Sequence, residues 1–354
     1  MSQEETGRTD ERRMARAVEL AQGVRTTTSP NPWVGCVIVD RAGHVVGEGA
    51  TAPPGGPHAE IAALALAGEQ ARGATVYVTL EPCAHQGRTP PCTDALIRAG
   101  VARVVAALGD PDERVSGAGF RALEKAGVAV SKGVLTAAVE DQLRPYIVHR
   151  STGRPYVVLK LAATLDGRTA APDGSSRWIT GPDARRDVHR LRAESDAVLV
   201  GAGTVRCDDP GLTVRYDGLP GQPRQPLRVV LGHVPAGARV QPALELGGDL
   251  SAVLDELGRR GVLQLLVEGG SHVAHAFHRD GLVDRYVWYL APAFLGGDDG
   301  RPVFAGPGVA TMASAWRGRL ISVRRLGGDL RIDVEPDLVH FPEPSAARYE
   351  TSPA

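Results

Sequence analysis

Few aromatic residues, almost no net charge and no long apolar run limit what this sequence can encode. Aromatic residues make up 5% of the 354 positions, which argues against a protein that binds nucleic acid by stacking on its bases. Because 40 Lys and Arg residues face 41 Asp and Glu residues, the net charge is -1, and a broad cationic surface for DNA is excluded. This balance still allows a local basic pocket for a phosphate. No apolar run approaches the length of about 18 residues that spans a bilayer.

Cysteine is also scarce. The four cysteines are too few for a disulfide framework in a chain of this length. We therefore expect a reducing, cytoplasmic setting, in which thiolates stay free to bind a metal. The chain starts Met-Ser-Gln-Glu-Glu-Thr, which lacks the apolar segment of a signal peptide.

The remaining composition is that of a folded protein with many turns. Hydrophobic residues make up 43% and charged residues 23%, and 43 Gly and 26 Pro predict abundant loops. At about 100–200 residues per domain, the length predicts two domains. Predicted helices and strands alternate in both halves, which indicates α/β domains with a central sheet covered by helices. We expect a disordered N-terminus at 1–12, a first domain at 13–149, a polar linker at 150–155, a second domain at 156–341 and a C-terminal tail at 342–354.

Hydrophobic periodicity and turn residues predict the individual elements. In the first domain we expect helices at 13–21, 58–71, 93–99, 119–126 and 135–148, and strands at 34–40, 44–49, 75–80, 101–108 and 128–130. In the second domain we expect helices at 183–193, 250–260 and 271–279, and strands at 156–161, 197–201, 227–231, 263–267, 285–290, 320–325 and 330–334.

A possible metal site lies in the first half. His58 opens a predicted helix, and Cys83 and Cys92 follow the next predicted strand. One imidazole and two thiolates make a three-ligand zinc site with an open position for water, which is typical of catalytic zinc. Zinc lowers the pKa of its bound water to ~7. Glu60, two residues after His58, could take a proton from that water and pass it to a leaving amine.

The spacing departs from the zinc-deaminase signature, His-x-Glu followed by Pro-Cys-x-x-Cys. Eight residues separate Cys83 and Cys92 here, so the loop 84–91 can line a pocket. Cys36, on an apolar strand, is expected to be a core residue. A closed structural zinc would need a fourth ligand, for which Cys36 or His85 could serve.

These motifs resemble those of the cytidine-deaminase superfamily. The resemblance is carried by the segments 31–39 (Asn-Pro-Trp-Val-Gly-Cys-Val-Ile-Val), 57–60 (Pro-His-Ala-Glu) and 79–83 (Thr-Leu-Glu-Pro-Cys). The loop 87–92 (Gly-Arg-Thr-Pro-Pro-Cys) is more selective and resembles the bifunctional pyrimidine deaminase/reductase of riboflavin biosynthesis. The resemblance implies hydrolytic deamination of a 2,5-diamino-6-(5-phosphoribosylamino)pyrimidinone to the uracil. It also implies that Asn31 holds the ring or ribose, and that His85 and Arg88 hold the phosphoribosyl end. The alternative for His85 and Arg88 is a solvated loop.

The second half has no Gly-x-Gly-x-x-Gly after a strand, so the usual dinucleotide fingerprint is absent. The segment 263–271 (Leu-Gln-Leu-Leu-Val-Glu-Gly-Gly-Ser) predicts a strand, a glycine turn and a helix start, whose free N–H groups suit a phosphate. The alternative is a plain glycine turn before a helix that Ser271 caps.

Four segments of this half resemble the reductase half of the same family, whose fold is similar to dihydrofolate reductase. They are 160–168, 176–180, 204–215 and 267–270, and with the first half the resemblance covers about residues 12–337. Gly232-His233 stands where the family would have Asp-Ser. The resemblance implies NADPH-dependent reduction of the ribosyl group to ribityl, and a homodimer or larger homo-oligomer.

By matched position, the resemblance also implies roles for single residues. The substrate residues of the reductase would be Lys160, Ser176, Arg192, Leu212, Arg215 and Glu268. The NADPH residues would be Ala162, Trp178, Thr204, Asp208, Gly269, Gly270 and Ser271. Lys160 and Asp208 would lie nearest the transferred hydride.

Other charged residues of this half have a simpler interpretation. Arg185, Arg186, His189 and Arg190 share a predicted helix and are expected to form its solvated face, and Asp209 and Arg206 are expected to form surface ion pairs. Two other functions fit the motifs less well: a nucleoside or tRNA deaminase fused to an unrelated reductase, and a zinc scaffold without catalysis.

Overall fold

The computed structural model describes residues 3–85, 90–112, 116–215 and 224–337. The chain divides between Ser151 and Thr152 into two compact units, each with its own sheet. Among the described residues, no helix combines the length and the apolar character that a membrane crossing requires.

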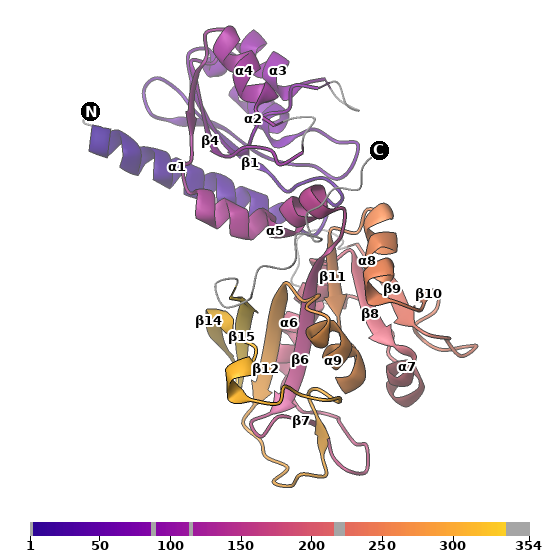
Figure 1. Ribbon diagram of the computed structural model, residues 1–354. Helices are drawn as coiled ribbons and strands as arrows, with labels where there is room; N and C mark the ends of the chain where they lie inside the picture. Colours follow the sequence, from indigo (N-terminus) through magenta and orange to yellow (C-terminus); the bar gives the residue numbers. More distant parts are fainter. Residues whose placement is uncertain (1–2, 86–89, 113–115, 216–223, 338–354) are drawn as a thin grey trace. The chain divides into compact units, whose positions relative to one another are not determined.

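The first unit is built on a five-stranded sheet in the order β2-β1-β3-β4-β5 (Figure 1). The strand β1 pairs antiparallel with β2 and β3, whereas β3, β4 and β5 are parallel. The strands are β1 (Gly35–Val39), β2 (Val45–Ala50), β3 (Thr75–Leu80), β4 (Arg103–Leu108) and β5 (Ala129–Lys132). The helices are α1 (Gln3–Val24), α2 (Ala59–Ala67), α3 (Cys92–Ala99), α4 (Ala118–Lys125) and α5 (Thr136–Thr152), with a 3₁₀ turn η1 (Gly68–Ala71) after α2.

A glycine lets α2 lie close to the sheet. A Cβ atom on Gly49 of β2 would lie 2.2 Å from the carbonyl oxygen of Ala59, the first residue of α2. Any side chain at this position would therefore push α2 away. His58 directly precedes α2, and Glu60 lies in its first turn. This contact therefore determines how deeply both residues are placed in the unit.

The N-terminus differs from the sequence-based expectation. Residues 1–12 were expected to be disordered, but α1 begins at Gln3. Asp10 is buried and accepts hydrogen bonds from Tyr77 at 2.8 Å and from Arg103 at 2.7 Å, which hold this turn of α1 on the sheet. The expected linker at 150–155 also begins inside a helix, since α5 runs to Thr152. The expected tail at 342–354 lies outside the described residues.

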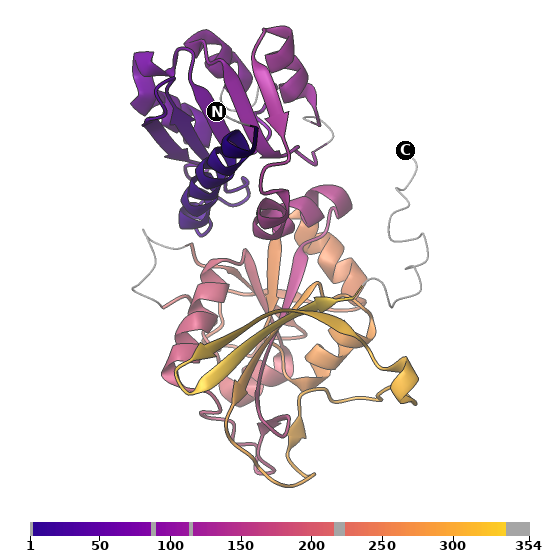
Figure 2. The ribbon, with the colours of Figure 1, turned by 90° about the vertical axis from the view of Figure 1, so that its left-hand side faces the viewer.

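The second unit contains an eight-stranded sheet in the order β10-β9-β8-β11-β6-β12-β15-β14 (Figure 2). The strands from β10 to β12 are parallel, and β15 and β14 are antiparallel to their neighbours. The strands are β6 (Tyr156–Thr164), β8 (Ala197–Gly201), β9 (Leu227–Leu231), β10 (Leu244–Leu246), β11 (Gln264–Val267), β12 (Arg285–Ala291), β14 (Gly318–Leu326) and β15 (Asp329–Pro336), with a separate pair β7 (Arg168–Ala170) and β13 (Arg301–Pro302). The helices are α6 (Pro182–Ala193), α7 (Ala202–Asp208), α8 (Leu250–Arg259) and α9 (Ser271–Arg279), with a 3₁₀ turn η2 (Met312–Ser314).

Helices cover both faces of this sheet. The core cluster joins β6 residues such as Leu159 to Leu257 of α8 and Phe277 of α9. The helix α6 lies on the opposite side of β6 from α9 (Figure 1). Its buried Leu191 faces inward, and its carboxylate Asp187 contacts the far end of the sheet.

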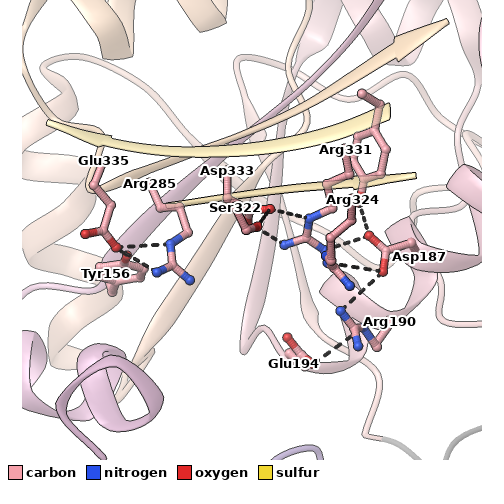
Figure 3. A network of polar contacts seen from close by, with 11 residues as sticks. Tyr156, Asp187, Arg190, Glu194, Arg285, Ser322, Arg324, Arg331, Asp333 and Glu335 are labelled. Atoms are coloured by element: carbon pink, nitrogen blue, oxygen red, sulfur yellow. Dashed lines mark hydrogen bonds and ion pairs between the residues drawn. The ribbon is translucent and has the colours of Figure 1, made fainter. Parts of the chain in front are cut away.

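The contact between α6 and β15 is polar, although it is buried. Asp187 accepts hydrogen bonds from Arg331 at 2.6 Å and from Tyr289 at 2.6 Å, and Arg331 also bonds Asp333 at 2.7 Å (Figure 3). Burial alone would raise the pKa of Asp187, but the guanidinium of Arg331 holds it below its usual range. The charges therefore stay ionised and paired, and they tie α6 to the sheet.

We predict that Asp187→Ala destabilises the second unit by about 3 kcal/mol, because it leaves the buried Arg331 without one of its two carboxylates. Urea unfolding followed by circular dichroism measures this loss. The matched control is Arg186→Ala on the exposed side of the same helix, which should change the free energy of unfolding by less than about 0.5 kcal/mol. Equal effects of the two substitutions would show that Asp187 stabilises the unit no more than an exposed residue of the same helix.

Candidate active sites

Three side chains of the first unit converge at the point predicted for a metal. His58, Cys83 and Cys92 each offer one ligand atom, and these atoms lie within 4.8 Å of one another. The Nδ1 atom of His58 is 3.6 Å from the Sγ atom of Cys83 and 3.3 Å from that of Cys92. One imidazole and two thiolates form a donor set that suits Zn²⁺.

Two helix starts and one strand end create this geometry. His58 is the extended residue before α2, and Cys92 is the first residue of α3. Both therefore lie at positive helix ends, and at Cys92 this position favours a thiolate over a thiol. Cys83 follows β3, and its Sγ atom accepts a hydrogen bond from the backbone N–H of Cys92 at 3.4 Å.

The sulfur atoms of this cluster need a cation. A hydrogen bond from the Cys92 thiol lowers the pKa of Cys83 to about 4, so Cys83 is a thiolate. The same bond, together with burial and the carboxylate of Glu60, raises the pKa of Cys92 well above its usual range. The two sulfurs cannot both ionise unless a positive charge lies between them, and a divalent metal supplies it.

Glu60 lies in the first turn of α2 with only 4% of its surface exposed. Burial raises its pKa to about 7. A carboxyl group with a pKa near neutrality can both accept and return a proton. Glu60 is not one of the converging ligand groups, which agrees with a role in proton transfer rather than in metal binding.

Within the described part of the chain, this cluster has no fourth protein ligand. Cys36 is fully buried in β1, as expected of a core residue, and burial raises the pKa of its thiol. His85 lines the neighbouring pocket but does not join the cluster. The residues present thus fit a zinc ion with an open position rather than a closed structural site.

A cavity of about 320 Å³ adjoins the cluster. His58, Cys83 and Glu60 form part of its wall, and the expected substrate residues Asn31 and His85 line it as well. The third expected substrate residue, at position 88, lies outside the described residues. The cavity therefore joins the metal cluster to two of the predicted binding residues.

Asp110 and Tyr146 also line this cavity and were missed by the sequence analysis. The Tyr146 hydroxyl donates a hydrogen bond to Asp110 at 3.2 Å, and burial raises the pKa of Asp110. Asp110 follows β4, which is parallel to β3, and the carboxyl ends of parallel strands meet at one sheet edge. That rule could have placed Asp110 near Cys83. Tyr146 comes from α5, and no sequence signal connects it with this site.

Glu81 holds the loops of this sheet edge together. Its buried carboxylate accepts hydrogen bonds from the backbone N–H groups of Gly119 at 2.8 Å, Gly117 at 3.0 Å and Asp110 at 3.2 Å. The segment that carries Cys83 is thus tied to the start of α4 and to the segment that carries Asp110.

A second cluster of charged side chains lies in the second unit. Glu268 follows β11 and accepts hydrogen bonds from Arg192 of α6, from Nε at 2.6 Å and from Nη2 at 3.0 Å. Burial lowers the pKa of Lys160 in β6, and the nearby Glu268 opposes this effect. Burial alone would raise the pKa of Glu268, but Arg192 and Lys160 keep it low. Three predicted substrate residues are therefore neighbours.

Leu212 and Arg215 belong to one segment, residues 212–215, which is hydrogen-bonded to Arg192 of this cluster. Arg192 donates from Nη1 to the carbonyl oxygen of Thr213 at 3.2 Å. The backbone N–H of Arg215 donates to Nδ1 of His189 at 3.2 Å. Leu212 is buried with a left-handed backbone (φ 48°). Two side chains of α6 thus hold the segment in place.

The expectation of a solvated face on this helix is wrong for most of its members. The guanidinium of Arg185 lies 4.4 Å from the centre of the Trp178 ring, and His189 binds the segment described above. Arg190 pairs with Asp187 at 3.3 Å, on the face of α6 that carries the buried polar contact with β15. Arg185, His189 and Arg192 are separated by four and three positions, and this helical spacing could have indicated these contacts.

The glycine turn before α9 has the features of a phosphate site. Gly270 precedes the helix with an extended backbone, and Ser271 is its first residue. The interpretation of Ser271 as the helix cap is therefore wrong, and its buried Oγ atom has no hydrogen-bond partner among the described residues. A Cβ atom on Gly269 would lie 2.5 Å from Val273, so only glycine fits this close turn. A buried hydroxyl at a positive helix end fits a phosphate of NADPH.

The helix α7 carries two further residues expected to bind the cofactor, Thr204 and Asp208. A Cβ atom on Gly270 would lie 3.4 Å from the Thr204 hydroxyl oxygen, so α7 adjoins the start of α9. The sequence analysis did not predict α7, because it begins with Ala-Gly directly after β8.

The segment with Ser176 and Trp178 also reaches α7. Arg177, which lies between them, donates a hydrogen bond to the carbonyl oxygen of Asp208 at 2.8 Å. The indole of Trp178 is 70% exposed and is therefore not part of the hydrophobic core. Ala162 lies on β6 and is half-buried.

The departure from the family pattern at positions 232–233 is accommodated beside β10. The N–H of Gly232 donates to the carbonyl oxygen of Leu246 at 2.8 Å, and His233 pairs with Glu245 at 2.9 Å. Both residues, Gly232 and His233, are therefore held by contacts with β10.

Both units match families of known proteins. The family model described as the cytidine and deoxycytidylate deaminase zinc-binding region matches residues 7–108, and the model of the RibD C-terminal domain matches residues 155–332. The riboflavin biosynthesis protein RibD of Escherichia coli is 43% identical over 360 residues, which cover 91% of this chain and 98% of that protein. RibD of Mycobacterium tuberculosis is 45% identical over 331 residues, which cover 91% and 96%.

Solved structures show the same similarity. RibD of Acinetobacter baumannii superimposes with a TM-score of 0.89 at 39% identity, covering 93% of this chain and 99% of that one. A diaminohydroxyphosphoribosylaminopyrimidine deaminase/5-amino-6-(5-phosphoribosylamino)uracil reductase of Thermotoga maritima gives a TM-score of 0.85 at 34% identity, covering 94% and 99%. Because these relatives carry both halves, a deaminase fused to an unrelated reductase is not needed to explain the chain.

We predict about one zinc ion per chain in the purified protein and almost none in Cys92→Ser, because two of three ligands cannot hold the ion in an open site. Metal analysis by mass spectrometry measures both values. The control is Cys207→Ser, which changes an exposed thiol outside the cluster and should keep the zinc. A folded Cys92→Ser variant that retains a full equivalent of zinc would exclude Cys92 as a ligand.

Proposed function

Since the chain belongs to the RibD family, whose members join a zinc-dependent deaminase to an NADPH-dependent reductase in riboflavin biosynthesis, we propose two consecutive reactions for its two units. The first unit hydrolyses 2,5-diamino-6-(5-phosphoribosylamino)pyrimidin-4(3H)-one to 5-amino-6-(5-phosphoribosylamino)uracil and ammonia. The second unit reduces the ribosyl group of that product to ribityl. The observation that carries the proposal is the open cluster of His58, Cys83 and Cys92 with the buried Glu60 beside it.

In the deaminase site, His58, Cys83 and Cys92 hold the zinc ion. When bound, zinc supplies a Lewis acid that makes water nucleophilic at neutral pH. The carboxylate of Glu60 accepts a proton from the attacking water and returns it to the ring amine, which leaves as ammonia. A group with a pKa of about 7 is suited to both steps.

We assign the rest of this pocket to substrate binding. Asn31 orients the pyrimidine or ribose, and His85 with Arg88 binds the phosphoribosyl end. The position of Asn31 and His85 in the wall of the cavity supports this assignment. Positively charged or hydrogen-bonding side chains are suited to a phosphate.

In the reductase site, NADPH supplies the hydride. The buried hydroxyl of Ser271 and the glycine turn at Gly269 and Gly270 are suited to its phosphate groups. The other proposed cofactor residues are Ala162, Trp178, Thr204 and Asp208.

Substrate binding in this unit uses a cluster with more positive than negative charge. Lys160 and Arg192 share the single carboxylate of Glu268, and Arg215 is held beside them. We propose that these side chains, with Ser176 and Leu212, bind the phosphoribosyl group. Lys160 and Asp208 are the polar groups proposed nearest the transferred hydride.

We also propose a cytoplasmic location and a homodimer or larger homo-oligomer. Four free cysteines, two of which act as metal ligands, support a reducing location. The assembly is proposed from the family resemblance, and analytical ultracentrifugation tests it.

We predict that Glu60→Gln lowers the rate of ammonia release by at least 100-fold, because the amide cannot accept a proton, while zinc stays bound. The assay couples ammonia release from the diaminopyrimidine ribotide to a dehydrogenase. The reductase of the same variant should reduce supplied 5-amino-6-(5-phosphoribosylamino)uracil at the unchanged rate, which controls for folding. Retained deamination would remove Glu60 from its role as proton carrier.

For the second unit we predict that Asp208→Asn slows NADPH oxidation at least tenfold, since Asp208 is placed close to the reacting atoms. The neighbouring Asp209→Asn is the control, because the side chain of Asp209 accepts from the backbone N–H of Arg239 at 2.8 Å and is not placed in the site. Absorbance at the NADPH band measures both rates. Equal losses in the two variants would assign the effect to local structure rather than to the site.

A further inference from the structure

The helix α6 presents one stripe of side chains to the reductase site. Arg185, His189 and Arg192 are four and three residues apart, so they share one face of the helix. Arg185 lies over Trp178 at 4.4 Å, and Arg192 is bonded to Glu268 at 2.6 Å. The middle member of the stripe, His189, therefore lies between one residue proposed to bind the cofactor and one proposed to bind the substrate.

The opposite face of α6 is fixed to the sheet by the buried polar network. Asp187 and Arg190 of this face pair with each other at 3.3 Å, and Asp187 is bonded to Arg331 of β15 (Figure 3). The directional bonds of this network hold the helix in one rotation about its axis. The stripe is thus presented by a rigid element.

His189 binds backbone rather than another side chain. Its Nδ1 atom accepts the N–H of Arg215 at 3.2 Å. An imidazole that accepts at Nδ1 carries its proton on Nε2, and the imidazolium form has no acceptor left. The bond therefore exists only with neutral His189.

This bond acts on a segment that Arg192 also holds. Arg192 donates to the carbonyl oxygen of Thr213 at 3.2 Å, two residues before the N–H that His189 accepts. The backbone of Leu212, at the start of the segment, is left-handed. Two contacts from one helix turn therefore define the path of residues 212–215.

We propose that His189 is a positioning residue of the reductase, which fixes residues 212–215, and with them Arg215, for substrate binding by accepting the Arg215 N–H. The inference rests on the proposed function of the second unit, because only that function makes Leu212 and Arg215 substrate-binding residues. It assigns His189 no direct contact with the substrate.

The charges that face His189 keep it neutral at physiological pH. Burial lowers its pKa, and the guanidinium groups of Arg192 and Arg215 lower it further, while a backbone hydrogen bond with Thr213 and the charge of Glu268 oppose them. As the pH falls through this lowered pKa, His189 gains a proton, loses its acceptor atom and releases the Arg215 N–H. The KM for the uracil ribotide should therefore rise on the acid side, whereas kcat should change less.

The test compares two variants of the full-length, zinc-loaded enzyme. His189→Leu removes the acceptor and should raise the KM for 5-amino-6-(5-phosphoribosylamino)uracil about fivefold at pH 7.5, the usual value of one neutral hydrogen bond. His189→Asn places an amide oxygen near the position of Nδ1 and cannot be protonated. It should restore the KM to within about twofold of the wild type and abolish the acid-side rise in KM.

Controls separate positioning from general damage. Ammonia release by the first unit should be unchanged in both variants, and Arg186→Ala, on an exposed position of the same helix, should leave the KM and its pH profile unchanged. Other groups that titrate, including the substrate phosphate and Glu268, are the same in wild type and His189→Asn. A difference between their pH profiles therefore belongs to His189.

The outcomes distinguish this inference from the proposed function. If the wild type oxidises no NADPH with the uracil ribotide, the proposed function of the second unit fails. If the wild type is active but His189→Leu keeps its KM, the positioning role fails. An acid-side rise in KM that persists in His189→Asn would also overturn it, even if His189→Leu does not fold.

Discussion

A charged group that leaves water needs an opposite charge beside it, and this constraint shapes both units. In the second unit Glu268 faces Arg192, and Asp187 faces Arg331, with bonds of 2.6 Å in both pairs. The first unit has the same problem with sulfur, because the hydrogen bond with Cys83 and burial together raise the pKa of Cys92. A divalent metal ion would supply the compensating charge there, in agreement with a donor set that fits zinc.

The charge that remains after pairing decides what each site can bind. In the first unit, burial raises the pKa of Glu60 to about 7, so this carboxyl group can exchange a proton near neutral pH. Around Glu268 the excess is positive, because Lys160 and Arg192 share one carboxylate. An excess of positive charge attracts a phosphate. The overall charge of -1 hides this local difference between the two sites.

The sequence predicted the parts whose pattern is local. The strand β3 and the helix α9 have the predicted bounds, and the three predicted metal ligands lie together, since their residue types and order are specific. Features created by contacts between distant segments were missed: residues 3–12 looked like a polar tail until Asp10 met Tyr77 and Arg103. In β15, alternation alone would turn the charged residues to water, yet Arg331 is 5% exposed and Leu330 37% exposed. This reversal of burial depends on Asp187 of α6, and no local sequence pattern connects Asp187 with this strand.

The polar contact of α6 has a consequence that an apolar contact would not have. Apolar side chains pack in several similar arrangements, whereas the bonds from Arg331 and Tyr289 to Asp187 satisfy only one rotation of the helix. A shift by one residue would turn the helix by about 100° and carry His189 and Arg192 away from residues 212–215. The desolvation cost of burying these charges is thus offset by bonds that also determine where the face of α6 with His189 and Arg192 points. The network lies outside the active site, but the accuracy of that site depends on it.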